Sequence, residues 1–275
     1  MINNEGHIDN IKGTFAINKT YYSLIYNNKN ATIDKIEGLF FDNGGYAVRN
    51  SGIIKSILAD FINEDKIYND GGIYNDGGTI TNIVGDFIGS RLNNGYSGTI
   101  DKIEGTFTNN KQGSQDNDAA IYNHSYSSSN QTLIKLILAD FIANQGRGIS
   151  NIYGGITDII SSFIGNSISL NTDYYHRTAK GGAIFNADDF DSSSEHVSYI
   201  GNITGRFLNN YASAIDNTQY SGEIYIGSAE GGAIYNTGRI DSITNSHFQN
   251  NYAEAKGRGD AFGGAIYNNT WDGIS

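Results

Sequence analysis

Aspartate recurs at one fixed point of a short phrase that repeats along the chain, directly after an isoleucine. The four copies that carry it have Asp9, Asp34, Asp101 and Asp241. Carboxylates on neighbouring repeat units could cleave a glycosidic bond as general acid and base, or could hold Ca²⁺. Only Asp9 and Asp34 lie in adjacent units, and lysines stand close by at Lys12, Lys35 and Lys102. The pattern favours a solvated turn whose charges compensate one another, with catalysis as the alternative.

Other reactive groups are scattered. A second aspartate, in the sequence Ala-Asp-Phe, occurs twice as Asp60 and Asp140, and two acidic stretches cover Asp116–Asp118 and Asp188–His196. Neither stretch has the ligand spacing of a twelve-residue Ca²⁺ loop. The five histidines are not paired, and the sequence contains no phosphate-binding loop and no serine nucleophile elbow. We therefore predict no catalytic, cofactor-binding or metal-binding residues, and no cofactor.

The composition excludes several classes of protein. The 275 residues include no proline and no cysteine, with 35 glycines and a net charge of −11. Without cysteine there is no disulfide scaffold, thiolate zinc site or thiol catalysis. Without proline there is no collagen or proline-rich linker. The negative charge disfavours binding to nucleic acid or to an anionic membrane surface, and no apolar run is long enough to insert into a membrane.

The elements that carry these residues are repeats. The phrase Ile-x-x-Ile-x-Gly-x-Phe-x-x-Asn occurs in nine copies, with some substitutions. The copies span residues 8–18, 33–43, 54–64, 80–90, 100–110, 134–144, 156–166, 200–210 and 240–251, the last with one extra residue before its phenylalanine. The closest copies are about 20 residues apart, which is too short for a pair of helices.

A second phrase, Gly-Gly-Ala-Ile-Tyr-Asn, lies between copies of the first. It is clearest at Gly181–Asn186, Gly231–Asn236 and Gly263–Asn268, with phenylalanine in place of tyrosine at the first of these. A larger repeat is also present, because Thr32–Phe40 returns as Thr99–Phe107 and Lys55–Ile62 returns as Lys135–Ile142. A block of several units has therefore been duplicated.

This pattern predicts a β-solenoid. Isoleucine, phenylalanine and tyrosine between glycine and asparagine favour short strands separated by corners, with one corner between the two isoleucines and others near the glycine and the asparagine. Stacked coils pair their strands in parallel about 4.8 Å apart. Almost every strand then has neighbours on both sides, which explains the missing proline. Proline at Ile203 or Phe207 should disrupt stacking, whereas proline at Ser193, in an insertion, should be tolerated.

Stacking places like residues above one another. We expect the isoleucine and phenylalanine columns to fill the core and the asparagine after each phenylalanine to form a ladder of side-chain amides. Insertions lengthen towards the C-terminus, at Ser167–Lys180, Ala187–Ser198, Tyr211–Glu230 and Tyr252–Phe262. Insertions at fixed points of a repeat often form a binding face. Within them we predict partner contacts at Tyr174, Tyr175, His176 and Arg177, because aromatic residues and arginine are favoured at interfaces.

A leucine-rich-repeat horseshoe is the alternative fold, but glycine here replaces its central leucine. The alternating Gly-Gly-Ala-Ile and Phe-x-x-Asn phrases, such as Gly181–Ile184 with Phe207–Asn210, resemble the polymorphic outer membrane proteins of chlamydiae and related autotransporter passengers. The resemblance implies an all-β, right-handed parallel β-helix of the pectin-lyase-like kind, here with nine or ten coils. It also implies display at the bacterial cell surface, in the outer membrane or outside the cell, and an adhesive role.

We therefore expect residues 1–275 to form a single β-solenoid domain. Because we recognise no polar cap at either end, we expect it to be a segment of a longer protein. The expected function is a non-enzymatic adhesion or interaction scaffold whose partner is a host-surface or glycan ligand, or a second copy of itself. The alternatives are a polysaccharide lyase or hydrolase on the same fold, and a purely structural stalk.

Overall fold

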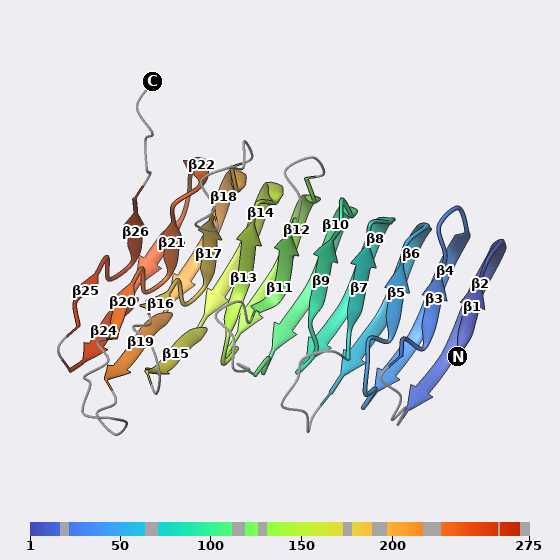
Figure 1. Cartoon of the computed structure of the whole chain (residues 1–275), viewed down its shortest axis with the longest axis horizontal. Helices are drawn as coiled ribbons and strands as arrows, with labels where there is room; N and C mark the ends of the chain where they lie inside the picture. The colour runs from blue at the N-terminus through green and yellow to red at the C-terminus, as the bar shows by residue number, and fades with distance from the viewer. Residues whose placement is uncertain are drawn as a thin grey trace.

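The computed structural model describes residues 1–16, 22–63, 71–111, 119–125, 131–172, 178–188, 197–216, 227–257 and 259–269. The regular structure in these ranges consists of β-strands. They contain no helix of the length and apolar character needed to cross a membrane. The strands stack along one axis from the N-terminal to the C-terminal end (Figure 1).

Two large parallel sheets form the body of the molecule. The first has short strands in the order β1-β3-β5-β7-β9-β11-β13-β17-β21-β26, and we call it the short-strand sheet. Its strands are β1 (Ile2–Asn4), β3 (Ile25–Asn27), β5 (Val48–Asn50), β7 (Ile73–Asp76), β9 (Leu92–Gly95), β11 (Ala119–His124), β13 (Arg147–Ile152), β17 (Ile184–Ala187), β21 (Ile234–Asn236) and β26 (Ile266–Asn268).

The second large sheet, which we call the long-strand sheet, follows the order β2-β4-β6-β8-β10-β12-β14-β18-β22. Its strands are β2 (His7–Ala16), β4 (Thr32–Phe41), β6 (Ile53–Ile62), β8 (Thr79–Ile88), β10 (Thr99–Thr108), β12 (Leu133–Ile142), β14 (Gly155–Ile164), β18 (Tyr199–Leu208) and β22 (Arg239–Ile243), and β23 (His247–Gln249) also pairs with β18. The extra residue of the last repeat thus splits one long strand into β22 and β23.

The chain visits the two sheets alternately, so that each short strand and the long strand after it form one coil of a right-handed parallel β-helix. Among the described residues the short-strand sheet has ten strands, which agrees with the nine or ten coils predicted. We expected a corner between the two isoleucines that separates two short strands, and this expectation is wrong: one ten-residue strand, such as β4, contains both isoleucines, and only its pairing is interrupted between them. Ile33 of β4 pairs with Ile54 of β6, and the pairing resumes where Lys35 pairs with Ser56. Asp34 therefore has no partner in the ladder. Ile33 and Ile36 are therefore both buried despite their three-residue spacing.

The core consists of the predicted columns. The isoleucines and phenylalanines of the repeat are buried in the middle coils and partly exposed at the two ends. Nine phenylalanine rings stack with centroids 4.5–5.1 Å apart and ring planes within 18° of parallel. They are Phe15, Phe40, Phe61, Phe87, Phe107, Phe141, Phe163, Phe207 and Phe248. Each fully buried ring of this column contributes about 1.5–3 kcal/mol by its burial.

Two asparagine ladders line the corners. The predicted ladder after the phenylalanines runs through Asn110, Asn144, Asn166, Asn210 and Asn251, with amide-to-oxygen distances of 2.7–3.0 Å. A longer ladder, which we did not predict from the sequence, uses an asparagine at or one residue before the end of each short strand. Its members are Asn4, Asn27, Asn50, Asn75, Asn94, Asn123, Asn151, Asn186, Asn236 and Asn268, joined at 2.6–2.9 Å. These bonds satisfy buried amides that would otherwise be costly.

The insertions of the C-terminal half are not only loops. Parts of three of them form strands that stack into two further parallel sheets, β15-β19-β24 and β16-β20-β25, which we call the side sheets. Their strands are β15 (Ser167–Thr172), β16 (Thr178–Lys180), β19 (Tyr211–Asp216), β20 (Ser228–Glu230), β24 (Tyr252–Lys256) and β25 (Ala261–Phe262). Figure 1 shows them beside the last coils. Small side chains such as Ala179, Ala212 and Ala229 form a separate core there with Ile168 and Leu170.

Candidate functional site

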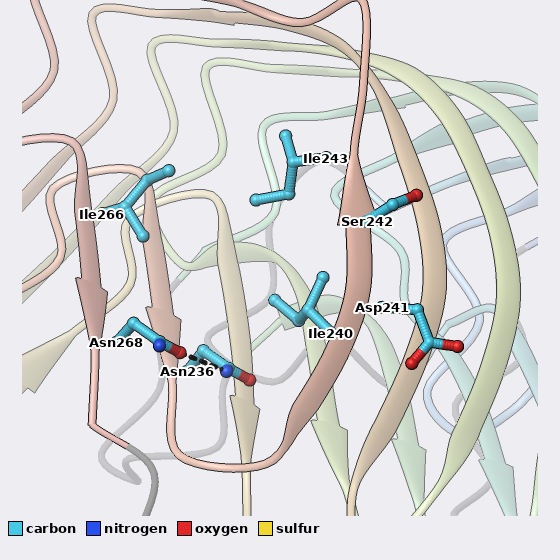
Figure 2. Close-up of a pocket in the computed structure, with 7 residues that line it drawn as sticks. All are labelled: Asn236, Ile240, Asp241, Ser242, Ile243, Ile266 and Asn268. Atoms are coloured by element: carbon cyan, nitrogen blue, oxygen red, sulfur yellow. Dashed lines mark hydrogen bonds between the residues drawn. The ribbon is translucent and has the colours of Figure 1, made fainter.

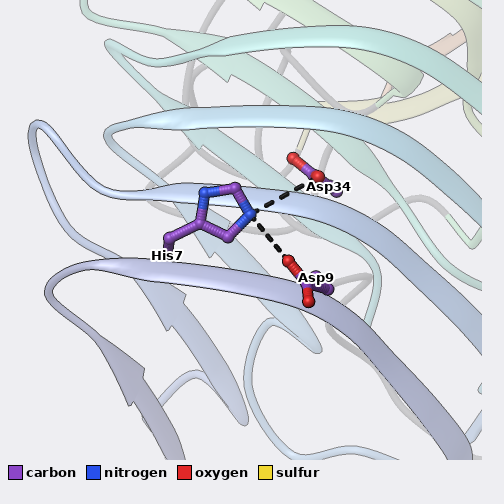
Figure 3. Close-up of side chains that lie close together, drawn as sticks. All are labelled: His7, Asp9 and Asp34. Atoms are coloured by element: carbon purple, nitrogen blue, oxygen red, sulfur yellow. Dashed lines mark ion pairs between the residues drawn. The ribbon is translucent and has the colours of Figure 1, made fainter.

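The structure brings together the two aspartates singled out in the sequence. Asp9 and Asp34 lie on adjacent coils, on the outer face of the long-strand sheet, and His7 lies between them (Figure 3). His7 Nε2 is 3.0 Å from Asp9 Oδ1 and 3.4 Å from Asp34 Oδ2. The group is open to solvent, because the Asp9 side chain is 93% exposed.

The electrostatics of this cluster favour charge compensation. Lys55 Nζ, one coil further along, lies 2.8 Å from Asp34 Oδ1. Its hydrogen bond, with smaller contributions from His7, lowers the pKa of Asp34, whereas a general acid needs a raised carboxyl pKa. The possible ligand atoms of His7, Asp9 and Asp34 lie within 4.8 Å of one another, but the ammonium group of Lys55 competes with a cation for Asp34.

The same ion pair recurs in the duplicated block, where Lys135 Nζ lies 2.7 Å from Asp101 Oδ1. Two of the lysines singled out in the sequence also form ion pairs with a glutamate two residues away. Lys35 pairs with Glu37, and Lys102 pairs with Glu104. Asp241 accepts hydrogen bonds from Tyr199 and Arg239. These contacts agree with the interpretation of this column as a solvated, compensated turn.

The remaining acidic residues flagged in the sequence cap the backbone where they are described. Asp60 Oδ1 accepts a bond from the backbone N–H of Asp86 at 2.9 Å, and Asp140 Oδ1 accepts one from that of Ser162 at 3.2 Å. Burial raises the pKa of Asp188, which accepts a bond from the backbone N–H of Ser198. Asp116–Asp118 and positions 189–196 lie outside the described residues.

The predicted partner contacts Tyr174, Tyr175, His176 and Arg177 also lie outside the described residues. In the sequence they fall between β15 and β16, the first strands of the two side sheets. The sequence does contain a signal for two later strands of the side sheets. Alanine occurs at every second position in Ala212-Ser213-Ala214 of β19 and in Ala253-Glu254-Ala255 of β24, which is the period of a β-strand. Because each run is short, the sequence alone does not distinguish it from the rest of the insertion.

The described residues also form a pocket of about 300 Å³ at the C-terminal end of the stack. Figure 2 shows Ile240 and Ile243 on β22 facing Ile266 on β26, while the Asn236 amide donates to Asn268 at 2.6 Å. These are the same core and ladder positions that are filled in every earlier coil. The pocket is therefore the open end of the solenoid core.

Comparison with known proteins identifies no relative of this chain. No protein-family model matches the chain, and neither a curated protein nor a solved structure matches it.

Proposed function

We propose that this chain is a surface-displayed or secreted interaction scaffold, a β-helical rod that holds binding segments on its side sheets. The observation that carries the proposal is the construction of the side sheets. Their strands pair coil on coil in register, for example Ser167–Thr172 with Tyr211–Asp216, and they have their own core. The ends of the segments that join such strands, for example Thr172 and Thr178, are therefore fixed in place beside the rod.

Two features of the body of the molecule support a scaffold role. Ring stacking and amide ladders tie every described coil to the next, which makes the rod stiff. The acidic cluster at Asp9 and Asp34 has the charge environment of a compensated pair, so the enzymatic alternative receives less support than the scaffold. The resemblance to autotransporter passengers favours an adhesive scaffold at the bacterial surface.

The test is a replacement of the segment between β15 and β16. Positions 173–177 are changed to a glycine-serine linker of equal length, and the matched control places the same linker at positions 126–130, which fall between β11 and β12 in the sequence. Binding to cultured epithelial cells, to a glycan array and to the immobilised chain itself is then measured.

We expect the parent to bind at least one of these targets, the 173–177 variant to bind at least about fivefold more weakly, and the control to match the parent. Equal melting temperatures would confirm that all three chains are folded. If the parent binds none of the targets, or if the 173–177 variant binds as well as the parent, the proposal is wrong and a purely structural stalk is the better account.

A further inference from the structure

The open C-terminal end of the core has the form of a missing strand. An inner long strand has a neighbour on each side, as β18 has in β14 and β22, whereas among the described residues β22 pairs with β18 alone. The short-strand sheet continues one strand further, because β26 pairs with β21. The pocket of about 300 Å³ lies beside β22 and β26, where the next long strand of the stack would lie. We call this position the strand slot.

The strand slot exposes side chains that are core residues in the earlier coils. Ile200 and Ile203 of β18 are fully buried, and they pair with Ile240 and Ile243 of the next coil. Ile240 and Ile243 themselves are only partly buried. Ile266 faces them across the slot and is 38% exposed (Figure 2). Covering this apolar surface with one more strand is therefore favourable.

Two hydrogen bonds of the repeat also have no counterpart at the strand slot. Asn186 of the long ladder donates to the carbonyl of Arg239, the first residue of the next long strand, at 3.3 Å. For Asn236, the next ladder residue, the described chain supplies no such strand. The backbone N–H of Arg239 donates to the carbonyl of Ser198, whereas no backbone N–H of the described residues donates to the carbonyl of Gly238. The slot thus presents both apolar and polar groups in the positions that a further long strand uses.

The occupant of the strand slot is an extended segment rather than a folded coil. In a second copy of this chain, β1 ends at Asn4 and β2 begins at His7. With that β2 placed on β22, β1 would lie at the level that β26 already occupies, because one coil advances the stack by one strand spacing of about 4.8 Å. Residues 270–275 lie outside the described residues and are fewer than the ten residues of a long strand such as β18.

We propose that the strand slot binds an extended segment of a partner protein by β-strand addition, and that this segment carries the long-strand phrase Ile-x-x-Ile-x-Gly-x-Phe. Its isoleucines would cover Ile240 and Ile243, and its phenylalanine would stack on Phe248, which repeats the pairing of β22 and β23 with β18. In such a complex the backbone bonds give affinity and the apolar side chains give specificity. The inference does not depend on the scaffold proposal, because the two large sheets form the slot and positions 173–177 do not.

The probe is the fluorescently labelled peptide TIDKIEGTFTNN, which has the sequence of Thr99–Asn110. Its binding to the full chain is measured by fluorescence anisotropy, and a scrambled peptide of the same composition tests whether the order of residues matters. The variant Ile266→Asp places a charge in the slot. Ile53→Asp is the matched control, because Ile53 lies on β6, away from the slot, and is 47% exposed.

We expect the peptide to bind the parent with a Kd of about 0.1 mM or tighter. The scrambled peptide should bind at least about tenfold more weakly, and Ile266→Asp should weaken binding of the ordered peptide by a similar factor, because the bound strand would bury its charge. Ile53→Asp should remain within about twofold of the parent. Melting temperatures show whether both variants are folded.

Hydrogen exchange of the parent locates the peptide without any substitution. Bound peptide should slow exchange at β22 and not at β2, the long strand at the opposite end of the stack. Sedimentation of the chain without peptide should show a monomer. The proposal is overturned if the peptide does not bind, if the scrambled peptide binds equally well, or if protection appears at β2 instead of β22. It is also overturned if the chain alone forms a dimer that Ile266→Asp dissociates, since the occupant is then a second copy.

Discussion

At the scale of single residues, the glycine after the second isoleucine of the repeat lies where there is no room for a side chain. A Cβ at Gly105 would lie 1.9 Å from the carbonyl oxygen of Gly85, and the φ of Gly105 is +132°. In the first coil, a Cβ at Gly13 would meet nothing closer than the Phe15 ring at 3.6 Å. The same position of the repeat therefore has room for a side chain in the first coil but not at Gly105.

We predict that Gly105→Ala destabilises the protein by about 2 kcal/mol or more, because both the contact and the backbone conformation disfavour a side chain. Gly13→Ala, which makes the same chemical change in the first coil, should cost no more than about 0.5 kcal/mol. Urea unfolding of the two variants measures the difference. Equal effects would contradict the close approach of the coils at this column.

Much of the residue-scale arrangement could be predicted from the sequence, because identical positions recur. Ile100, Ile103 and Phe107 are all buried, as their repetition predicts. The glycine was expected to mark a corner, but positive φ is found at Gly38 and Gly105 and not throughout the column. The left-handed corner lies instead just before the ladder asparagine, for example at Asn109 with φ 54°.

At the scale of the strands, the missing proline follows from the ladders. Ile203 on β18 pairs with Ile159 on one side and Ile243 on the other, so the strand is bonded on both sides. A turn at Asn28–Ala31 has the opposite character. The backbone N–H of Ala31 donates to the backbone carbonyl of Asn28, and Asn30 has a φ of 69°. These two features are those of a type II turn in which Lys29 is the second residue, a position that favours proline.

We predict that Ile203→Pro lowers stability by about 3 kcal/mol or more, through a lost ladder bond and a lost core side chain. Lys29→Pro should leave the melting temperature unchanged or slightly raised. Thermal unfolding followed by circular dichroism compares the two variants. Lys29 serves as the tolerant site because Ser193, the tolerant site expected from the sequence, lies outside the described residues. Equal losses at both sites would refute the difference between strand and turn.

The elements that could not be predicted are the side sheets. The repeat phrases identified the long strands because nine copies reinforce one another, whereas β16 and β20 have three residues each. Strands of that length have no detectable period of their own. They form because the neighbouring coil supplies a partner in register, Ala179 opposite Ala229, which is a tertiary effect.

At the scale of the whole molecule, each coil contacts its neighbours along one continuous core. The side sheets begin only after β14. In a solenoid, stability is a sum of local terms between neighbouring repeats. A change in the N-terminal coils should therefore leave the side sheets intact.

The central claim is the stacking of coils in one register, even across a long insertion. Asp158 and Asn202 are 44 residues apart, yet they pair directly, and the Asn202 amide donates to the Asp158 carboxylate at 2.8 Å. Because the chain has no cysteine, a pair of introduced cysteines reports on this pairing without background. The control pair combines position 158 with Thr204, which lies opposite Ile160. The Cα atoms of positions 158 and 204 are then roughly 8 Å apart, which is too far for a disulfide.

The most direct measurement is the disulfide yield in the oxidised variants Asp158→Cys/Asn202→Cys and Asp158→Cys/Thr204→Cys, read by mass spectrometry without reduction. We predict that the first pair closes nearly completely and that the second remains reduced. Equal yields, or closure of the second pair alone, would contradict the register and with it the β-helix.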